Sequence, residues 1–287
     1  MSLELARSAV SIARIFPSPL PTPATAQPFV AATTGQRCEM KYWGTEAQAA
    51  LLLQQARAHM DLDPYCLNGP QRHTSVYLDS PNRTFFEMHR TGAVVRYKLR
   101  VRTYDDPDGP AFLEVKCKAR SATMKQRTTV TQEIGRAVLA GQTDAVGDLR
   151  RTAALNDFMF LYHRHLVEPT LVVAAWRLAL TSKDDGGMFR LTFDRGIRYQ
   201  HARPGPLQGQ PKGWIPIDLV ERSGRADMKV LIEMKFVDAA PAWLAPAISG
   251  LRLRPTSFSK YIASLSQDLA QTDFGRMTDP FDDREDD

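Results

Sequence analysis

Charged and apolar residues alternate along several short segments of the chain. From residue 96 to residue 102, cations occupy every second position of the sequence RYKLRVR, and apolar side chains occupy the positions between them. Residues 112–118, FLEVKCK, repeat the pattern with Glu114, Lys116 and Lys118 in one phase. Because successive side chains of a β-strand point to opposite faces, the pattern predicts strands with one charged face and one apolar face.

The same alternation recurs in residues 37–42, 176–178, 189–194 and 232–236. A single strand of this kind is typical of an antiparallel sheet with its charged face in water. In these segments together, however, the polar phase holds mostly Arg, Lys and Glu and few uncharged polar residues. If the strands close into a barrel, the charged faces point inward. Only water and a polyanion can fill such an interior, because an unpaired buried charge costs several kcal/mol.

Two segments have a helical period instead. Residues 46–59 are rich in Ala, Leu and Gln and carry apolar residues at helical spacing, which predicts a helix. Residues 257–271, SFSKYIASLSQDLAQ, predict an amphipathic helix that packs against the barrel, because one helical face carries Phe258, Tyr261, Ile262, Leu265 and Leu269.

The two ends of the chain differ in composition from the rest. Residues 1–36 contain the proline cluster PSPLPTPATAQP, which predicts a flexible leader. Residues 279–287, DPFDDREDD, carry a net charge of −5, so the overall charge of +5 leaves +10 for the remainder. The basic body predicts an anionic partner. The acidic end predicts a disordered, solubilising tail.

Cysteine usage and hydropathy indicate the compartment. The 3 cysteines form no C-x-x-C pair, which argues against a disulfide framework or a zinc cluster and favours a reducing compartment. No apolar run reaches the roughly 18 residues of a membrane span. The N-terminal stretch makes a poor signal peptide, because charged residues interrupt it before the prolines. We therefore expect a cytoplasmic protein without a membrane span.

The charged positions also form an ordered series along the chain, found in the stretches HTSVYLDSP, RYKLRVRTY, FLEVKCKAR, FRLTFDR, VLIEMKF and FSKY. The series consists of Glu39-x-Lys41, Arg100-x-Arg102, Glu114-x-Lys116, Arg177, Arg190, Glu233-x-Lys235 and Lys260. In order and spacing it resembles the vacuolar transporter chaperone (VTC) domain. This domain is the polyphosphate polymerase branch of the CYTH-like triphosphate tunnel metalloenzymes. The resemblance spans roughly residues 37 to 270.

The resemblance implies a mainly β (α+β) fold. We expect a closed eight-stranded antiparallel β-barrel tunnel with flanking helices and a C-terminal plug helix. The tunnel domain would span residues 37–272, between the leader of residues 1–36 and an acidic, disordered tail of residues 273–287.

Site residues follow from the resemblance position by position. Those matching the family's phosphate-binding cations are Lys41, Arg100, Arg102, Lys116, Arg177, Arg190 and Lys235. A further cation is expected between residues 121 and 127, where the spacing leaves Lys125 and Arg127 open. Lys260 matches the lysine of the plug helix and, with Arg100 and Arg102, is the predicted catalytic set. Glu233 matches the carboxylate that holds Mn²⁺ or Mg²⁺. Glu39 and Glu114 either ligate the metal or hold a neighbouring lysine in an ion pair.

The family's function implies ATP and inorganic polyphosphate as partners. The terminal phosphate of ATP would pass to the end of a growing polyphosphate chain. Rows of Arg and Lys suit this reaction, because phosphoryl transfer depends on positioning and on stabilising negative charge. Two alternatives remain: a hydrolase that cleaves tripolyphosphate or a nucleoside triphosphate, and a polyphosphate-binding module without turnover. We expect no nucleic-acid partner, because aromatic and basic residues do not interleave as in stacking platforms.

Two other features have structural interpretations. His163 and His165 are separated by one residue but lack a matching third metal ligand in the surrounding sequence FMFLYHRHLVEP. Asp79 ends a predicted strand just before a proline turn, where Asp commonly accepts backbone hydrogen bonds.

Overall fold

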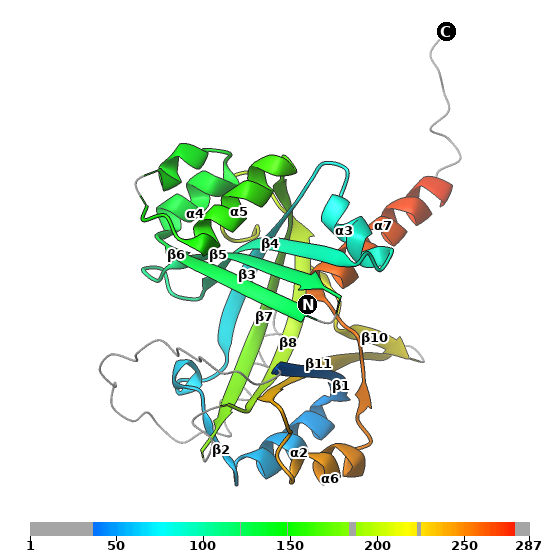
Figure 1. The fold of residues 1–287 in the computed structure, drawn as a ribbon. Helices are drawn as coiled ribbons and strands as arrows, with labels where there is room; N and C mark the ends of the chain where they lie inside the picture. Colours follow the sequence, from blue (N-terminus) through cyan, green and yellow to red (C-terminus); the bar gives the residue numbers. More distant parts are fainter. Residues whose placement is uncertain (1–36, 121, 148, 184–187, 223–224, 279–287) are drawn as a thin grey trace.

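The computed structural model describes residues 37–120, 122–147, 149–183, 188–222 and 225–278 (Figure 1). The predicted leader and residues 279–287 of the predicted tail lie outside the described residues.

Strands make up most of the described chain. They are β1 (Arg37–Thr45), β2 (Met60–Leu62), β3 (Gln71–Asp79), β4 (Val95–Tyr104), β5 (Ala111–Ala119), β6 (Ala122–Val130), β7 (Glu168–Ser182), β8 (Arg190–His201), β9 (Ile215–Pro216), β10 (Leu219–Arg222), β11 (Arg225–Val237) and β12 (Arg254–Pro255). The helices of the described residues are α2 (Glu46–Ala56), α3 (Thr84–Arg90), α4 (Gln132–Leu139), α5 (Ala153–Arg164), α6 (Leu244–Gly250) and α7 (Lys260–Thr278), with 3-10 turns η1 (Pro64–Cys66) and η2 (Thr143–Val146).

The strands form one curled antiparallel sheet with the hydrogen-bonded order β12-β1-β11-β8-β7-β3-β4-β5-β6. Three short strands attach at the side: β10 pairs with β11, β2 with β7 and β9 with β8. The mainly β fold with flanking helices is therefore as predicted. The closed barrel is not confirmed, because in the described chain the pairing order ends at β6 on one side and at β12 on the other.

The alternation in the sequence places each side chain on the predicted face of its strand. In β4, Leu99 and Val101 are buried in an apolar cluster on the convex side of the sheet, together with Leu113 of β5. Arg100 lies between them in sequence and contacts Glu114 across the opposite, concave side. The apolar phase thus builds the core, and the charged phase lines the concave face.

Helices cover the convex side in two groups, which Figure 1 shows at opposite ends of the sheet. Side chains of α4 and α5, such as Val138 and Phe158, pack on β3, β4 and β5. Side chains of α2 and α6, such as Leu52 and Leu244, pack on β1, β8 and β11. With both apolar halves of the convex face covered, the rows of alternating charge in the strands face the concave side.

Helix α7 packs against one end of the concave face. Its residues Tyr261 and Leu265 are buried together with Tyr77 of β3, Tyr199 of β8 and Leu231 of β11. The rings of Tyr261 and Tyr77 stack with centroids 4.9 Å apart. This packing matches the apolar stripe predicted for residues 257–271, although complete closure of a tunnel by the helix is not confirmed.

Asp79 anchors two helices at this end. Its carboxylate accepts hydrogen bonds from the backbone N–H groups of Ser80 at 2.8 Å, Phe85 at 2.8 Å and Phe86 at 2.9 Å. It also accepts one from the hydroxyl of Tyr261 at 2.6 Å. The structural interpretation of Asp79 is confirmed, and the residue joins the start of α3 to α7, which lie side by side in Figure 1.

Helix boundaries differ from the sequence predictions in two places. The helix predicted for residues 46–59 begins at Glu46 behind the capping residue Thr45 but ends at Ala56, because β2 pairs with β7 soon afterwards. The C-terminal helix runs from Lys260 to Thr278 and so extends past residue 271, where the predicted helix ended. None of the described helices has an apolar stretch that would span a membrane.

We predict that Tyr261→Phe destabilises the protein by about 1.5–3 kcal/mol, because the buried carboxylate of Asp79 loses the hydrogen bond that the Tyr261 hydroxyl donates. Urea unfolding measures the change. Tyr65→Phe is the matched control, because Tyr65 is 69% exposed. Equal unfolding midpoints for the two variants would show that the Tyr261 hydroxyl does not secure α7.

Candidate functional site

The first cluster of charges on the concave face surrounds Glu114 of β5. Arg100 of β4 and Arg127 of β6 lie directly opposite it in the two neighbouring strands. Their Nε atoms donate to its carboxylate at 2.6 Å and 2.8 Å, and Lys125 Nζ lies 3.0 Å from Oε1. Arg102 Nε is 3.9 Å away. Lys125 and Arg127, between which the sequence could not choose, therefore both reach the same carboxylate.

This cluster keeps Glu114 ionised. The carboxylate is 2% exposed, and burial by itself raises the pKa of a carboxyl group. The charges of Arg100 and Arg102 nevertheless hold the pKa of Glu114 well below its usual range. In this structure Glu114 acts as an ion-pair partner for cations of three adjacent strands.

The second cluster surrounds Asp194 of β8, which is fully buried. Arg177 of β7 donates to both oxygens of Asp194 at 2.6 Å, in a bidentate pair, and Lys260 Nζ of α7 donates to Oδ2 at 2.5 Å. Burial raises the pKa of Asp194, but the charges of Arg177 and Lys260 hold it below its usual range. The first residue of α7 is thus attached to the charged face.

Glu233 of β11 extends this second cluster. Its carboxylate lies 3.3 Å from Lys41 Nζ, 3.3 Å from Lys235 Nζ and 3.6 Å from Arg177 Nη2. Lys41 Nζ also donates to the carbonyl of Phe258, just before α7, at 2.8 Å. Strands β1, β7 and β11 and the α7 segment therefore meet at one carboxylate.

A third carboxylate, Glu39 of β1, reaches across the concave face. It lies 2.9 Å from Lys41 of its own strand and 3.5 Å from Lys116 of β5. Burial raises its pKa, yet the charges of Lys235 and Lys41 lower the pKa of Glu39 to about 2. Because β1 and β5 lie far apart in the pairing order, this contact shows how strongly the sheet curls.

Arg190 of β8 joins the same face. It lies directly opposite Lys235 of β11, and its Nη2 is 2.9 Å from Asp63, which precedes η1. Its Nε is buried without a hydrogen-bond partner among the described residues. The predicted site residues therefore lie on the concave face in two clusters linked by Lys116 and Glu39, with Arg190 beside Lys235 of the second cluster.

Sequence reasoning missed several residues of the site. Asp194 shares the phase of Arg190 and Thr192, so the alternation contained a signal for it. His73 and Tyr77 of β3 lie between the two clusters. Burial and then the charge of Arg177 lower the pKa of His73 well below its ordinary value, so the imidazole is neutral. Tyr77 accepts a hydrogen bond from Arg100 at 3.1 Å.

The carboxylates of the described concave face would supply only part of the ligand shell of a metal ion. Within the described residues, no three His, Cys, Asp or Glu side chains are grouped so as to hold a metal ion. Glu39 and Glu233 share Lys41 and are hard oxygen donors of the kind that Mg²⁺ and Mn²⁺ prefer. Because Mg²⁺ takes about six oxygen ligands, phosphate oxygens and water would have to supply the rest of the shell.

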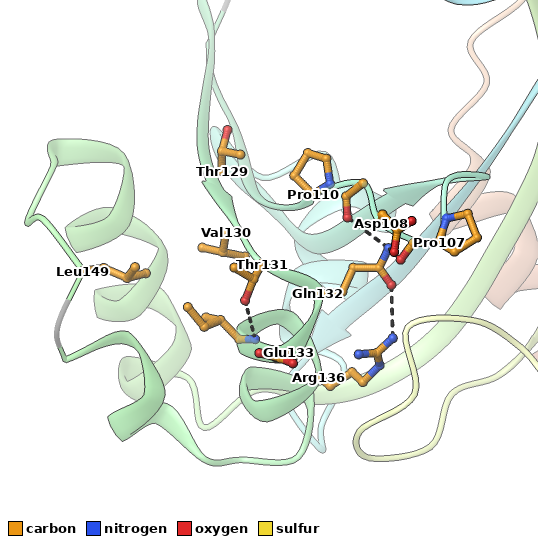
Figure 2. Close-up of a pocket in the computed structure, with 12 residues that line it drawn as sticks. Pro107, Asp108, Pro110, Thr129, Val130, Thr131, Gln132, Glu133, Arg136 and Leu149 are labelled. Carbon is orange, nitrogen blue, oxygen red and sulfur yellow. Dashed lines mark hydrogen bonds between the residues drawn. The ribbon is translucent and has the colours of Figure 1, made fainter.

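A surface pocket of about 670 Å³ lies elsewhere, between the β4–β5 turn and the start of α4 (Figure 2). The Gln132 side chain donates to the carbonyls of Asp106, Pro107 and Gly109 at 2.9–3.0 Å and accepts from Arg136. The polar groups of the pocket wall thus hydrogen-bond to one another and hold the β4–β5 turn against the start of α4. The pocket lacks the dense cations of the concave face.

His163 and His165 lie at the end of α5, where the His165 ring packs on Phe85.

The concave face combines rows of Arg and Lys from separate strands with a lysine at the start of a packed helix. Residues 36–267 of the chain match the family model of the VTC domain. The chain belongs to the VTC domain family. The resemblance inferred from the charged series is therefore confirmed, and with it the place of this VTC domain in the CYTH-like superfamily. A comparison with curated proteins found no match.

In this VTC domain the carboxylates orient the cations. Arg100 and Arg127 are held by Glu114, Arg177 by Asp194 and Glu233, and Arg190 by Asp63. Cations outnumber carboxylates in both clusters, so positive potential remains after the internal pairing. The arrangement is suited to bind an extended polyanion.

We predict that Glu114→Gln destabilises the ligand-free domain by about 3–5 kcal/mol, because it leaves a group of buried cations without their counter-charge. Tripolyphosphate should recover part of the loss by supplying anionic oxygens. Thermal and urea unfolding, with and without tripolyphosphate, measure both effects.

Glu87→Gln is the control for this change. Glu87 pairs with Arg90 on the exposed surface of α3, so its loss should leave the unfolding midpoint unchanged with or without tripolyphosphate. A Glu114→Gln midpoint equal to that of Glu87→Gln would contradict the central place of Glu114.

Proposed function

We propose that this VTC domain is a metal-dependent polyphosphate polymerase, which transfers the terminal phosphate of ATP to a growing polyphosphate chain. One observation carries the proposal: cations from β1, β4, β5, β6, β7, β8, β11 and α7 converge on one concave face, most of them paired with three buried carboxylates. Membership of the VTC domain family supports the same function.

The residue types suit phosphoryl transfer. Its transition state is loose and spreads negative charge over the transferred group, so fixed cations provide most of the stabilisation. Arg100 and Arg177 already present their guanidinium groups in fixed orientations, because Glu114 and Asp194 hold them. A planar guanidinium can bind two phosphate oxygens at once, whereas a lysine acts as a point charge.

Lys260 is proposed as a catalytic residue together with Arg100 and Arg102. Its ammonium group lies beside Arg177 on the shared carboxylate of Asp194, at the start of the helix that covers one end of the concave face. From this position it would neutralise charge on the transferred phosphate. Lys41, Lys116, Lys125, Arg127, Arg190 and Lys235 would bind the remaining phosphates.

Glu233, with Glu39 beside it, would hold Mn²⁺ or Mg²⁺ once phosphates are present. The metal would supply further positive charge to the phosphate oxygens. Binding of phosphates would also draw Lys41 and Lys235 away from Glu233, because phosphate is a stronger partner for these lysines than a carboxylate already shared among several cations.

The closed tunnel and plug helix also belong to this proposal. Lys116 Nζ of β5 lies 3.5 Å from the carboxylate of Glu39 of β1, so side chains from the two sides of the curled sheet meet across the concavity. A polyphosphate chain between these sides would be surrounded by the cationic rows. Helix α7 would block the end that Tyr261 and Leu265 cover, so the product would leave by the other end.

The test is ATP turnover by the purified protein with Mn²⁺ or Mg²⁺. Arg100→Ala and Glu233→Ala should each lower the rate of polyphosphate formation about 100-fold or more, as expected when a fixed charge is removed from a phosphoryl-transfer site. Lys260→Ala should have a comparable effect. Arg195→Ala is the control, because Arg195 pairs with Glu46 at the start of α2 and not with the carboxylates of the concave face.

The product distinguishes this proposal from its alternatives. Long acid-labile polymer indicates a polymerase, whereas orthophosphate without polymer indicates a hydrolase on the same face. Tight polyphosphate binding without either product indicates a binding module. Unchanged turnover in both Arg100→Ala and Glu233→Ala would place the reaction away from the concave face.

A further inference from the structure

Three lysines lie side by side across the strands β4, β5 and β6. Lys98 is directly opposite Lys116, and Lys116 is directly opposite Lys125. We refer to them as the lysine triplet. Side chains directly opposite each other in an antiparallel pair have Cβ atoms about 4.5–5.5 Å apart, and like charges at this position are destabilising.

The next position of the same phase along these three strands carries a different set of charges. There Arg100, Glu114 and Arg127 lie opposite one another, so a carboxylate separates two cations. The lysine triplet has no acidic member. Lys116 reaches Glu39 of β1 at 3.5 Å, and Lys125 shares Glu114 at 3.0 Å. In the part of the chain that the structure describes, Lys98 forms no salt bridge.

Lys98 faces the concavity and is surrounded mainly by cations. It has the same phase in β4 as Arg100, and the charges of Lys116, Lys41 and Arg100 act on it against that of Glu39. On α3, burial and then the charge of Lys98 lower the pKa of His89. Burial, followed by the charges of Lys116 and Lys41, lowers the pKa of Lys98 to about 7. Burial likewise lowers the pKa of Lys125 to about 7.

Lys116 and Lys125 each have a carboxylate partner, but Lys98 stands opposite Lys116 with no salt bridge among the described residues, which is unfavourable until an anion binds beside it. A lysine that only improved solubility would extend into water and would keep its ordinary pKa. The geometry therefore indicates a place where negative charge binds.

Within the triplet, Lys116 and Lys125 contact carboxylates of the proposed site, Glu39 and Glu114, and Lys98 lies further out. The charges of Arg102 and Lys260 both contribute, after burial, to the lowered pKa of His73, whereas Lys98 is two positions further along β4 from Arg100. Two residues along a strand correspond to roughly 7 Å. A phosphate chain that follows β4 from Arg102 past Arg100 would reach Lys98 only after its first phosphates are bound.

We propose that the lysine triplet is a separate subsite for the distal phosphates of a polyphosphate chain, and that Lys98 makes binding depend on chain length. This inference rests on the proposed function and assigns a role to a residue outside the series of cations that suggested it. The subsite recognises a linear chain of phosphates, because its cations continue the row already formed by Arg100 and Arg102.

Isothermal titration of wild type and Lys98→Met with tripolyphosphate and with a long polyphosphate tests the proposal. Lys98→Met should weaken binding of the long chain about tenfold, as expected for one lost charge-assisted contact, and should change tripolyphosphate binding less than about twofold. Lys98→Arg should restore most of the affinity. Lys183→Met removes the same charge from a lysine that pairs with Asp61 and should affect neither ligand.

Proton uptake gives a second measurement. Bound phosphates favour the charged form of Lys98 and raise its pKa, so the long chain should bind with uptake of protons near pH 7. Its affinity should fall as the pH rises from 7 to 9. Titrations in two buffers with different heats of ionisation measure the uptake, which Lys98→Met should reduce. Some proton uptake should remain in Lys98→Met, because Lys125 would still take up protons.

Each other outcome has a definite meaning. Equal weakening of both phosphate ligands by Lys98→Met would overturn the length-dependent subsite while leaving the proposed function intact. Unchanged affinity of Lys98→Met for the long chain would overturn the subsite in the same way. If Lys98→Met weakened the binding of a single-stranded oligonucleotide as much as that of the long polyphosphate, the specificity for polyphosphate would be overturned. Failure of wild type to bind any phosphate chain would overturn the proposed function as well.

Discussion

The structure depends on compensating a high density of positive charge on the inner face of a curled sheet. Three carboxylates, Glu114, Asp194 and Glu233, provide most of this compensation, and each is less than 10% exposed. Every one of them contacts cations from more than one strand or helix. Because breaking a buried ion pair leaves an uncompensated charge, these contacts link the strand arrangement directly to the electrostatics of the site.

The same compensation prepares the site for an anionic ligand. A guanidinium that is already held by a carboxylate loses little conformational freedom when a phosphate binds, so less free energy is lost in ordering the side chain. The pairing is incomplete, since cations outnumber carboxylates, and an incoming phosphate chain adds the missing negative charge. Folding and binding therefore draw on the same few side chains.

Helix α7 connects the fold to the site. Tyr261 secures it to Asp79 and stacks on Tyr77, while the preceding residue, Lys260, reaches Asp194. Two consecutive side chains of one helix thus make a structural contact and a contact within the proposed site. A shift of the helix would change both, so the position of Lys260 is set by the packing around its neighbour.

The sequence alone determined which face each side chain of a strand occupies, because the alternation of β-structure is a local property of the backbone. It also indicated the family, since the order of charged motifs is readable along the chain. It could not assign ionic partners: Asp194 and Lys260 are 66 residues apart. Nor could it separate Lys125 from Arg127, which share one face of β6. Only the tertiary structure decided these contacts, because strand order, register and curl depend on packing between distant segments.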